Sequence, residues 1–276
     1  MSTFADDIAR SHAIPAFPKI LSEILFVADD PGRSISDLEP LVSQELALST
    51  RLIHLANSGY YGGKGTKSVH EAIARLGGST VKSLSTAILL LDTLSSLPKL
   101  NRNLLKQCWT TALTATEVSK MLTRKKNPSL TAPLFWALIA GPIGRVLLAA
   151  HYGERYDQIA KLPILPSRKK EEASFSTHHL EVGKCIAIRW SFPKESLDII
   201  DELIENKQTD ATKVFALTEA LAQWIAISRH KELPPSDKFL EQFKDTTHSI
   251  GIEEKELIEQ TPRFCQFACF AASLTS

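Results

Sequence analysis

The chain has 276 residues, of which 43% are hydrophobic and 23% are charged, as is ordinary for a globular protein. Its 32 basic residues are matched by 31 acidic ones, so the net charge of +1 gives no electrostatic argument for a nucleic-acid partner or an anionic membrane. The four cysteines, Cys108, Cys185, Cys265 and Cys269, show no metal-ligand spacing, and we interpret them as small hydrophobic side chains in a reduced core.

The first lobe of the predicted fold, about residues 12–98, is built of short helices. Apolar residues recur at helical spacing within 20–28, 48–56 and 81–91. Two pairs, Ser34 with Asp37 and Ser68 with Glu71, have the spacing of capping boxes that open helices. Gly77 is expected to close a helix in the left-handed helical conformation.

The second lobe, about residues 99–276, is predicted to contain longer helices. Apolar periodicity places them over 102–124, 132–151, 169–190, 194–206 and 214–228, with shorter ones near 237–247, 252–260 and 262–274. No segment shows convincing strand alternation. The predicted fold class is therefore all-α, a single unit over residues 1–276 in two packed helical lobes.

Neither the N-terminal residues nor the most apolar stretch predicts a membrane anchor. Residues 1–7 lack a basic region followed by an apolar run, so no signal peptide is expected. Residues 134–150 are apolar but are interrupted by Gly141, Pro142 and Arg145, and we expect this stretch to be too short to cross a bilayer. The sequence thus predicts a cytoplasmic protein with no membrane partner.

Several blocks agree in order and spacing with a known family. After the proline-flanked lead-in at residues 14–18, residues 51–62 read RLIHLANSGYYG and residues 71–77 read EAIARLG. Together they resemble the signature of the HDOD family, and a weaker match continues through residues 179–193. The resemblance covers about residues 14–205. It implies a second lobe folded as a degenerate HD-phosphohydrolase-like helical bundle, and a role in signalling.

The resemblance also places the metal ligands of an HD-type phosphohydrolase, and these are replaced here. Such enzymes hold a divalent metal with an early His, a His-Asp pair and a later Asp, and the metal activates a water. The early His falls at Thr111 and the pair at Gly141-Pro142, where neither side chain offers a lone-pair donor. A later histidine pair of many relatives falls near 203–204. We therefore predict no metal, no cofactor and no catalytic residue.

His179 remains recognisable from the motif. Adjacent residues on a helix point about 100° apart, so His178 and His179 are not expected to chelate one ion. We expect His178 in solvent near a helix start and His179 packed between the lobes. A vestigial cavity lined by Thr111, Gly141, Pro142 and His179 could bind a nucleotide or a peptide without turning it over.

Five first-lobe residues stand out as polar or aromatic groups in apolar surroundings. They are Arg51, Asn57, Ser58, Tyr60 and Arg75. One interpretation is structural: Asn57 and Ser58 end their helix, while the arginines bind free carbonyls or a carboxylate such as that of Asp92. The other is a surface that contacts a partner or a small anion.

The leading hypothesis for function is a non-catalytic regulatory or interaction domain of bacterial signal transduction. The domain would act in trans on another signalling protein, or bind a nucleotide or small anion. The alternative is a metal-dependent phosphohydrolase or phosphodiesterase with altered ligands, against which Gly141 and Pro142 argue. Nucleic-acid binding through first-lobe helices is a third hypothesis, disfavoured by the neutral charge.

Overall fold

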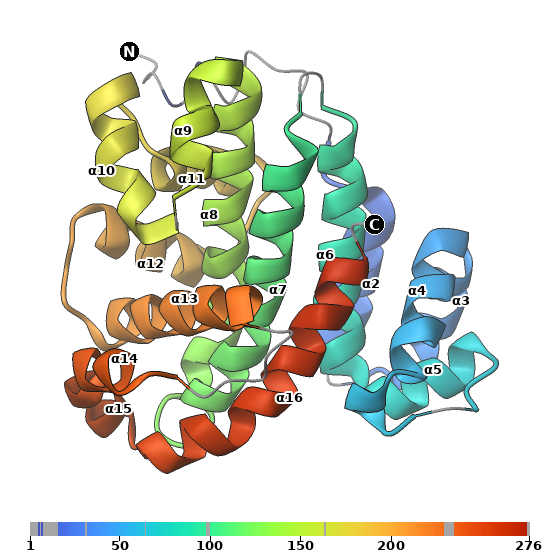
Figure 1. The fold of residues 1–276 in the computed structure, drawn as a ribbon. Coiled ribbons are helices and arrows are strands. Elements are labelled where there is room, and N and C mark those ends of the chain that lie inside the picture. Colours follow the sequence, from blue (N-terminus) through green and yellow to red (C-terminus); the bar gives the residue numbers. More distant parts are fainter. Residues whose placement is uncertain are drawn as a thin grey trace. The chain divides into compact units, whose positions relative to one another are not determined.

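The computed structural model (Figure 1) describes residues 5, 7, 16–30, 32–63, 65–97, 100–162, 164–228 and 235–274. The described residues form helices and contain no strand, which confirms the all-α fold class. The chain divides into two compact units whose main ranges are Pro15–Ser96 and Leu97–Ala272. Residues 14 and 15 of the lead-in, and Pro98 at the expected lobe boundary, lie outside the described residues.

The smaller unit consists of short helices around an aliphatic core. In chain order they are α2 (Lys19–Asp29), η1 (Ile35–Leu38), α3 (Glu39–Ser43), α4 (Leu46–Ala56), η2 (Gly59–Tyr61), α5 (Val69–Leu76) and α6 (Gly78–Ser95). The buried faces of α2, α4 and α6 include Leu21, Leu52 and Leu84, as the apolar spacing predicts. The longest of them is α6, with 18 residues, and Gly77 separates it from α5.

The caps of this unit agree with the sequence in part. Ser34 and Asp37 form the expected capping box, although the helix that they open is the 3-10 helix η1. The second box is only half formed: the Ser68 hydroxyl accepts a hydrogen bond from the Glu71 amide at 3.1 Å, but Glu71 accepts from the Lys67 amide instead. The left-handed cap predicted at Gly77 is wrong, because φ is 76° and ψ is 155°. Gly77 must end α5 and start α6 at once, which requires a more extended backbone.

The larger unit holds the remaining helices around a long central one. These are α7 (Arg102–Thr123), η3 (Pro128–Leu130), α8 (Thr131–Tyr152), η4 (Gly153–Tyr156), α9 (Asp157–Ala160), α10 (Ile164–Phe175), α11 (His179–Arg189), α12 (Lys194–Ile204), α13 (Asp210–Ser228), α14 (Asp237–Gln242), α15 (Lys244–Ile250) and α16 (Glu254–Ser273). Helix α8 packs against α7, α11 and α12, and α13 packs across α7 (Figure 1). This packing places the sequence-predicted motif positions in the core.

Two predicted helix boundaries are corrected. The single helix expected over 169–190 is broken into α10 and α11 at Ser176, which has a φ of 55°. The two helices expected over 252–274 are one continuous helix, α16, with Pro262 inside it. Proline removes only one backbone donor, and the neighbouring Thr261 hydroxyl donates to the Leu257 carbonyl at 2.8 Å.

Helix α8 matches the helix predicted over 132–151, and it lies within a longer helical stretch. Within the described residues, the helical stretch Pro128–Ala160 has 33 residues, and its most apolar 18-residue window has a mean hydropathy of 1.6, enough by length and composition to cross a membrane. Our expectation that this region is too short is therefore wrong. Of its most apolar window, 89% is buried inside the protein. The core helix of a globular unit passes the same test, so this one helix is weak evidence for a membrane span.

Candidate functional site

Two glycines let α8 and α11 meet backbone to backbone. A Cβ atom added at Gly144 would lie 1.9 Å from the carbonyl oxygen of His179, and one added at Gly183 would lie 2.2 Å from that of Ala140. Neither distance admits a side chain. The crossing brings His179 against Gly141, where an added Cβ would lie 3.7 Å from the imidazole Cδ2. Of the four positions predicted to line a vestigial cavity, the structure thus brings two together here.

The residues present do not fit the divalent metal of an HD-type enzyme. Thr111 is buried on α7, and Gly141 and Pro142 lie inside α8 without side-chain donors. A Cβ on Gly141 would lie 3.5 Å from the Leu180 side chain. The space beside the position that corresponds to the lost histidine is therefore occupied by Leu180. Among the described residues, no three His, Cys, Asp or Glu side chains are grouped so that they could hold a metal ion.

His179 is held by a buried carboxylate from the preceding helix. The Oε2 of Glu171 accepts from the His179 amide at 2.8 Å and lies 2.7 Å from its Nδ1, and Tyr156 donates its hydroxyl to Oε1. Burial alone would raise the pKa of Glu171. The attraction of the His179 imidazole and these hydrogen bonds outweigh burial and lower the pKa to about 2. Glu171 therefore caps α11 as an ionised group and fixes the orientation of the ring.

Arg145, from the retained tail of the motif, has a structural role. It is buried on α8, and its Nη2 donates to the carbonyls of Ile159 and Ala160 at 3.0 and 3.1 Å. It also lies near two buried groups, Cys108 of α7 and Glu219 of α13. Burial raises the pKa of Cys108 to about 11 and that of Glu219 to about 7, against the attraction of Arg145. The raised pKa keeps Cys108 protonated at pH 7, so this cluster offers no thiolate nucleophile.

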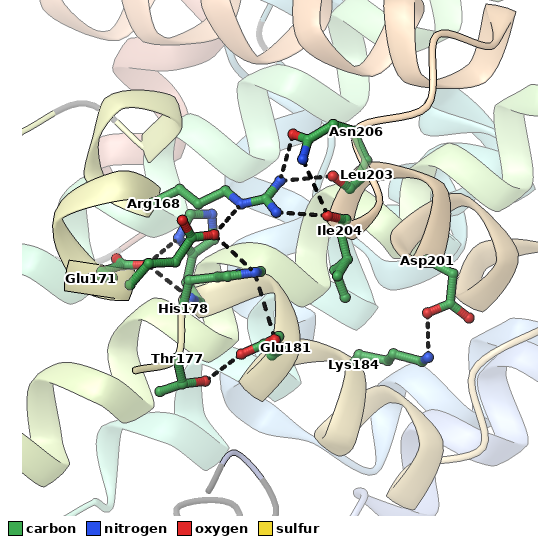
Figure 2. A network of polar contacts seen from close by, with 12 residues as sticks. Arg168, Glu171, Thr177, His178, Glu181, Lys184, Asp201, Leu203, Ile204 and Asn206 are labelled. Atoms are coloured by element: carbon green, nitrogen blue, oxygen red, sulfur yellow. Dashed lines mark hydrogen bonds and ion pairs between the residues drawn. The ribbon is translucent and has the colours of Figure 1, made fainter. Parts of the chain in front are cut away.

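Residues 203 and 204, to which the resemblance assigns a later histidine pair, contact Arg168 (Figure 2). The Arg168 guanidinium donates to the carbonyls of Leu203 and Ile204, both at 2.7 Å, and to the side chain of Asn206 at 3.2 Å. Its Nε donates to Glu172 at 2.9 Å. Arg168 thereby satisfies the last carbonyls of α12, so this end of the helix supplies backbone acceptors to a cation and no metal ligand.

His178 is buried, so its predicted place in solvent is wrong. It precedes α11, and its Nε2 lies 3.5 Å from Glu172 and 3.9 Å from Glu181. Figure 2 shows the contact between His178 and Glu181. Burial lowers the pKa of His178 to about 4, and the charges of Arg168 and His179 add to this against the two carboxylates. The physical reason for the burial is the break before α11, which turns the chain inward so that His179 can reach Glu171. His178 is a neutral imidazole at pH 7.

A cavity of about 300 Å³ opens beside this network. Helices α10, α11 and α12 contribute Arg168, His179, Leu180 and Leu203 to its lining, and further lining residues come from 206–216 and 242–246. Thr111, Gly141 and Pro142 are not among the lining residues. His179 is therefore the one member of the predicted vestigial set that faces this cavity.

In the smaller unit, the contacts of Asn57, Arg75 and Arg51 agree with the structural interpretation, whereas the Ser58 side chain makes no capping hydrogen bond. Asn57 ends α4, and its side chain exchanges hydrogen bonds with the backbone of Thr66 at 2.8 and 2.9 Å. Arg75 donates to the carbonyls of Ala56 and Gly63, and Arg51 pairs with Asp92 at 3.1 Å. These bonds hold the loop after α4.

Two further signature residues add packing to this loop. The ring of Tyr60 lies 4.7 Å from that of Tyr61, edge to face. The Ser58 hydroxyl is buried and has no hydrogen-bond partner among the described residues. Whether any of the five also contacts a partner stays a prediction.

Sequence reasoning missed Glu171, Arg168 and Glu219. The first two lie in the charged run of residues 168–172, which is typical of a solvated helix face. Glu219 lies two residues from the buried Leu217 and Leu221, a spacing that places a residue on another helix face. No local pattern indicates that these three groups are buried.

The fold defines an all-α helical domain, in which the positions that the resemblance assigns to the metal ligands of an HD-type enzyme are Thr111, Gly141 and Pro142. The chain belongs to the HDOD family, whose domain model matches residues 14–204. A Treponema pallidum protein of uncharacterised function is 25% identical over 195 residues. That alignment covers 69% of this chain and spans 37% of the relative's length.

Solved structures show the same fold. An HDOD domain protein of unknown function from Geobacter sulfurreducens is 21% identical with a TM-score of 0.72, over 98% of both chains. A Shewanella amazonensis SB2B protein, described provisionally as a phosphohydrolase, is 20% identical with a TM-score of 0.67, over 99% of both. A Marinobacter aquaeolei VT8 protein, described provisionally as a signal transduction protein, is 18% identical with a TM-score of 0.68, over 95% of this chain and 60% of that one. At these identities, the likeness concerns the fold alone.

Proposed function

We propose that this chain is a non-catalytic regulatory or interaction domain of bacterial signal transduction, which acts in trans in the cytoplasm. One observation carries the proposal: Gly141 and Pro142, the positions of the metal-binding pair, lie in the interior of α8 and bring no donor atom. A divalent metal needs several lone-pair donors aimed into one cavity, and backbone adjustment cannot supply them. The provisional description of the Marinobacter protein as a signal transduction protein agrees with this function.

The polar groups that remain support a scaffold rather than a reaction centre. Glu171, Arg145 and Arg168 each bind backbone groups at helix ends. A catalytic group must change its protonation or its partner during turnover. The side chains of Glu171, Arg145 and Arg168 instead hydrogen-bond to backbone groups of α11, α9 and α12. A buried polar network that is satisfied in this way rigidifies a domain and fixes the surface that it presents. The partner of such a surface would be another signalling protein or a small ligand.

The alternative function, hydrolysis with altered ligands, is favoured by one observation. A carboxylate that holds the far nitrogen of a histidine is the usual support of a metal-binding imidazole, and the pair of Glu171 with His179 has that geometry. The Shewanella protein is described provisionally as a phosphohydrolase. Within the part of the chain that the structure describes, no three His, Cys, Asp or Glu side chains are grouped so that they could hold a metal ion, so we rank this function second.

The two functions differ in metal content and turnover. Protein purified without a metal-affinity tag would be assayed for divalent metals by mass spectrometry, and for phosphodiester hydrolysis with added manganese. We expect metal far below one equivalent and no turnover above buffer. About one equivalent of metal together with turnover that His179→Ala abolishes would overturn the regulatory proposal. A matched control is His248→Ala, since His248 lies on α15 and does not line the cavity.

A further inference from the structure

The cavity beside His179 is rich in cations. Its lining includes Arg168, Lys207 and Lys213, and no Asp or Glu among the described residues lines it. A recess with low-dielectric walls focuses the field of such charges and attracts anions. At about 300 Å³, the cavity is at the small end of the range for sites that bind small molecules.

The three cations are not equally available. Arg168 is fixed by the carbonyls at the end of α12, and it cancels the negative end of that helix beside the cavity. Lys207 pairs with Glu205 at 2.6 Å, but both side chains are 55% exposed, and an exposed pair of this kind is weak and exchangeable. Lys213 has no ion-pair partner within the described part of the chain, and it lies in the first turns of α13.

The remaining walls suit the organic part of a ligand. Leu180 and Phe215 are buried in the walls, while Leu203 and Phe243 are half-buried at the cavity. Gln208 and Thr212 add uncharged hydrogen-bonding groups. A few polar groups among apolar and aromatic walls are typical of small-molecule sites. A free inorganic anion would leave the apolar walls in contact with water.

We infer that this cavity binds a small organic phosphate monoester, with the phosphate at Lys207 and Lys213 and the apolar body against Phe215 and Leu180. A phosphate monoester carries a charge of about −1.5 to −2 at pH 7, which matches two lysines better than a carboxylate does. The inference rests on the proposed function, because it names the ligand class that a non-catalytic domain would sense. It is separate from the old metal positions, since Thr111, Gly141 and Pro142 do not line the cavity.

Isothermal titration calorimetry of the full chain with phenyl phosphate tests the inference, with inorganic phosphate and benzoate as the two half-ligands. We expect phenyl phosphate to bind at least about tenfold more tightly than either, since each lacks one set of contacts. Lys213→Gln and Lys207→Gln should each weaken phenyl phosphate binding about five- to tenfold. Lys194→Gln is the matched control, because Lys194 starts α12 and does not line the cavity. A thermal melt of each variant verifies that it folds.

Absence of phenyl phosphate binding, or binding that the double variant of Lys207 and Lys213 leaves unchanged, would overturn the inference. Benzoate that binds as tightly as phenyl phosphate would also overturn it, because the phosphate would then not be recognised. Release of phenol in the presence of manganese would refute the non-catalytic function, but it would still support binding of the phosphate monoester. No binding and no turnover would refute the site and leave a function through protein partners.

Discussion

The side chain of Glu171 reaches from α10 to the first residue of α11, where its Oε2 lies 2.7 Å from the Nδ1 of His179 and 2.8 Å from the His179 amide. One carboxylate therefore caps a helix and orients the histidine that survives from an HD-type motif. Because Glu171 is fully buried, this pair depends on the charge of the carboxylate. Its consequences for stability can be measured.

Glu171→Gln should destabilise the larger unit. We expect a loss of about 3 kcal/mol at pH 7 in urea unfolding, since one partner of a buried charged pair is removed. The folded-state pKa of about 2 lies below the ordinary value of 4.5, so this stabilisation is full above pH 4.5 and is lost as the pH falls toward 2. The control is Glu259→Gln, in an exposed pair on α16. Equal, small losses in both variants would contradict the role of Glu171.

Glu219→Gln should have the opposite pH dependence. Burial raises the pKa of Glu219 to about 7, so its neutral form is favoured on folding, and the stability that it contributes is full below pH 4.5 and lost as the pH rises through 7. An amide keeps the shape without the charge. We expect Glu219→Gln to gain about 2 kcal/mol relative to wild type at pH 8 and little at pH 4.5. A variant less stable at pH 8 would show that the ionised form is needed.

His178 should remain neutral well below the usual range of histidine. Its folded pKa of about 4 lies below the ordinary 6.5, so the unfolded chain takes up a proton first, and stability falls as the pH drops from 6.5 to 4. We expect the His178 ring signals in nuclear magnetic resonance spectra to show no titration between pH 7 and 5. The variant His178→Asn should remove about one proton from the pH dependence of unfolding in that window. Titration near pH 6.5 would show that the ring reaches water.

Alanine substitutions at Gly141 and Gly144 of α8 should have different effects on stability, because only Gly144 contacts the backbone of α11. Gly144→Ala should cost about 3 kcal/mol or more in unfolding free energy, because the new Cβ would overlap the backbone of α11. Gly141→Ala should be neutral or stabilising by up to about 1 kcal/mol, since its Cβ would meet Leu180 and His179 at ordinary contact distances. Urea unfolding of both variants checks this. Equal effects would contradict the backbone contact between α8 and α11.

The sequence by itself determined the features that depend on local pattern or on residue identity. The all-α class followed from helical periodicity, and the cap at Ser34 followed from short-range spacing. The family could be inferred from sequence blocks that keep the order and spacing of the HDOD signature. The lack of metal-ligating side chains at Gly141 and Pro142 needed no coordinates, because neither residue type has a side-chain donor atom.

Only the tertiary structure decided which distant groups meet. Arg168 binds the carbonyls of residues 35 and 36 positions further along the chain, and Gly144 touches the backbone of α11; neither contact has a local signal. The charged run around Glu171 is typical of a solvent-facing helix. Glu171 is nevertheless buried, because its carboxylate accepts a hydrogen bond from the first amide of α11. Local periodicity reports which face of a helix is apolar. It does not report which polar group the packing will require at the end of another helix.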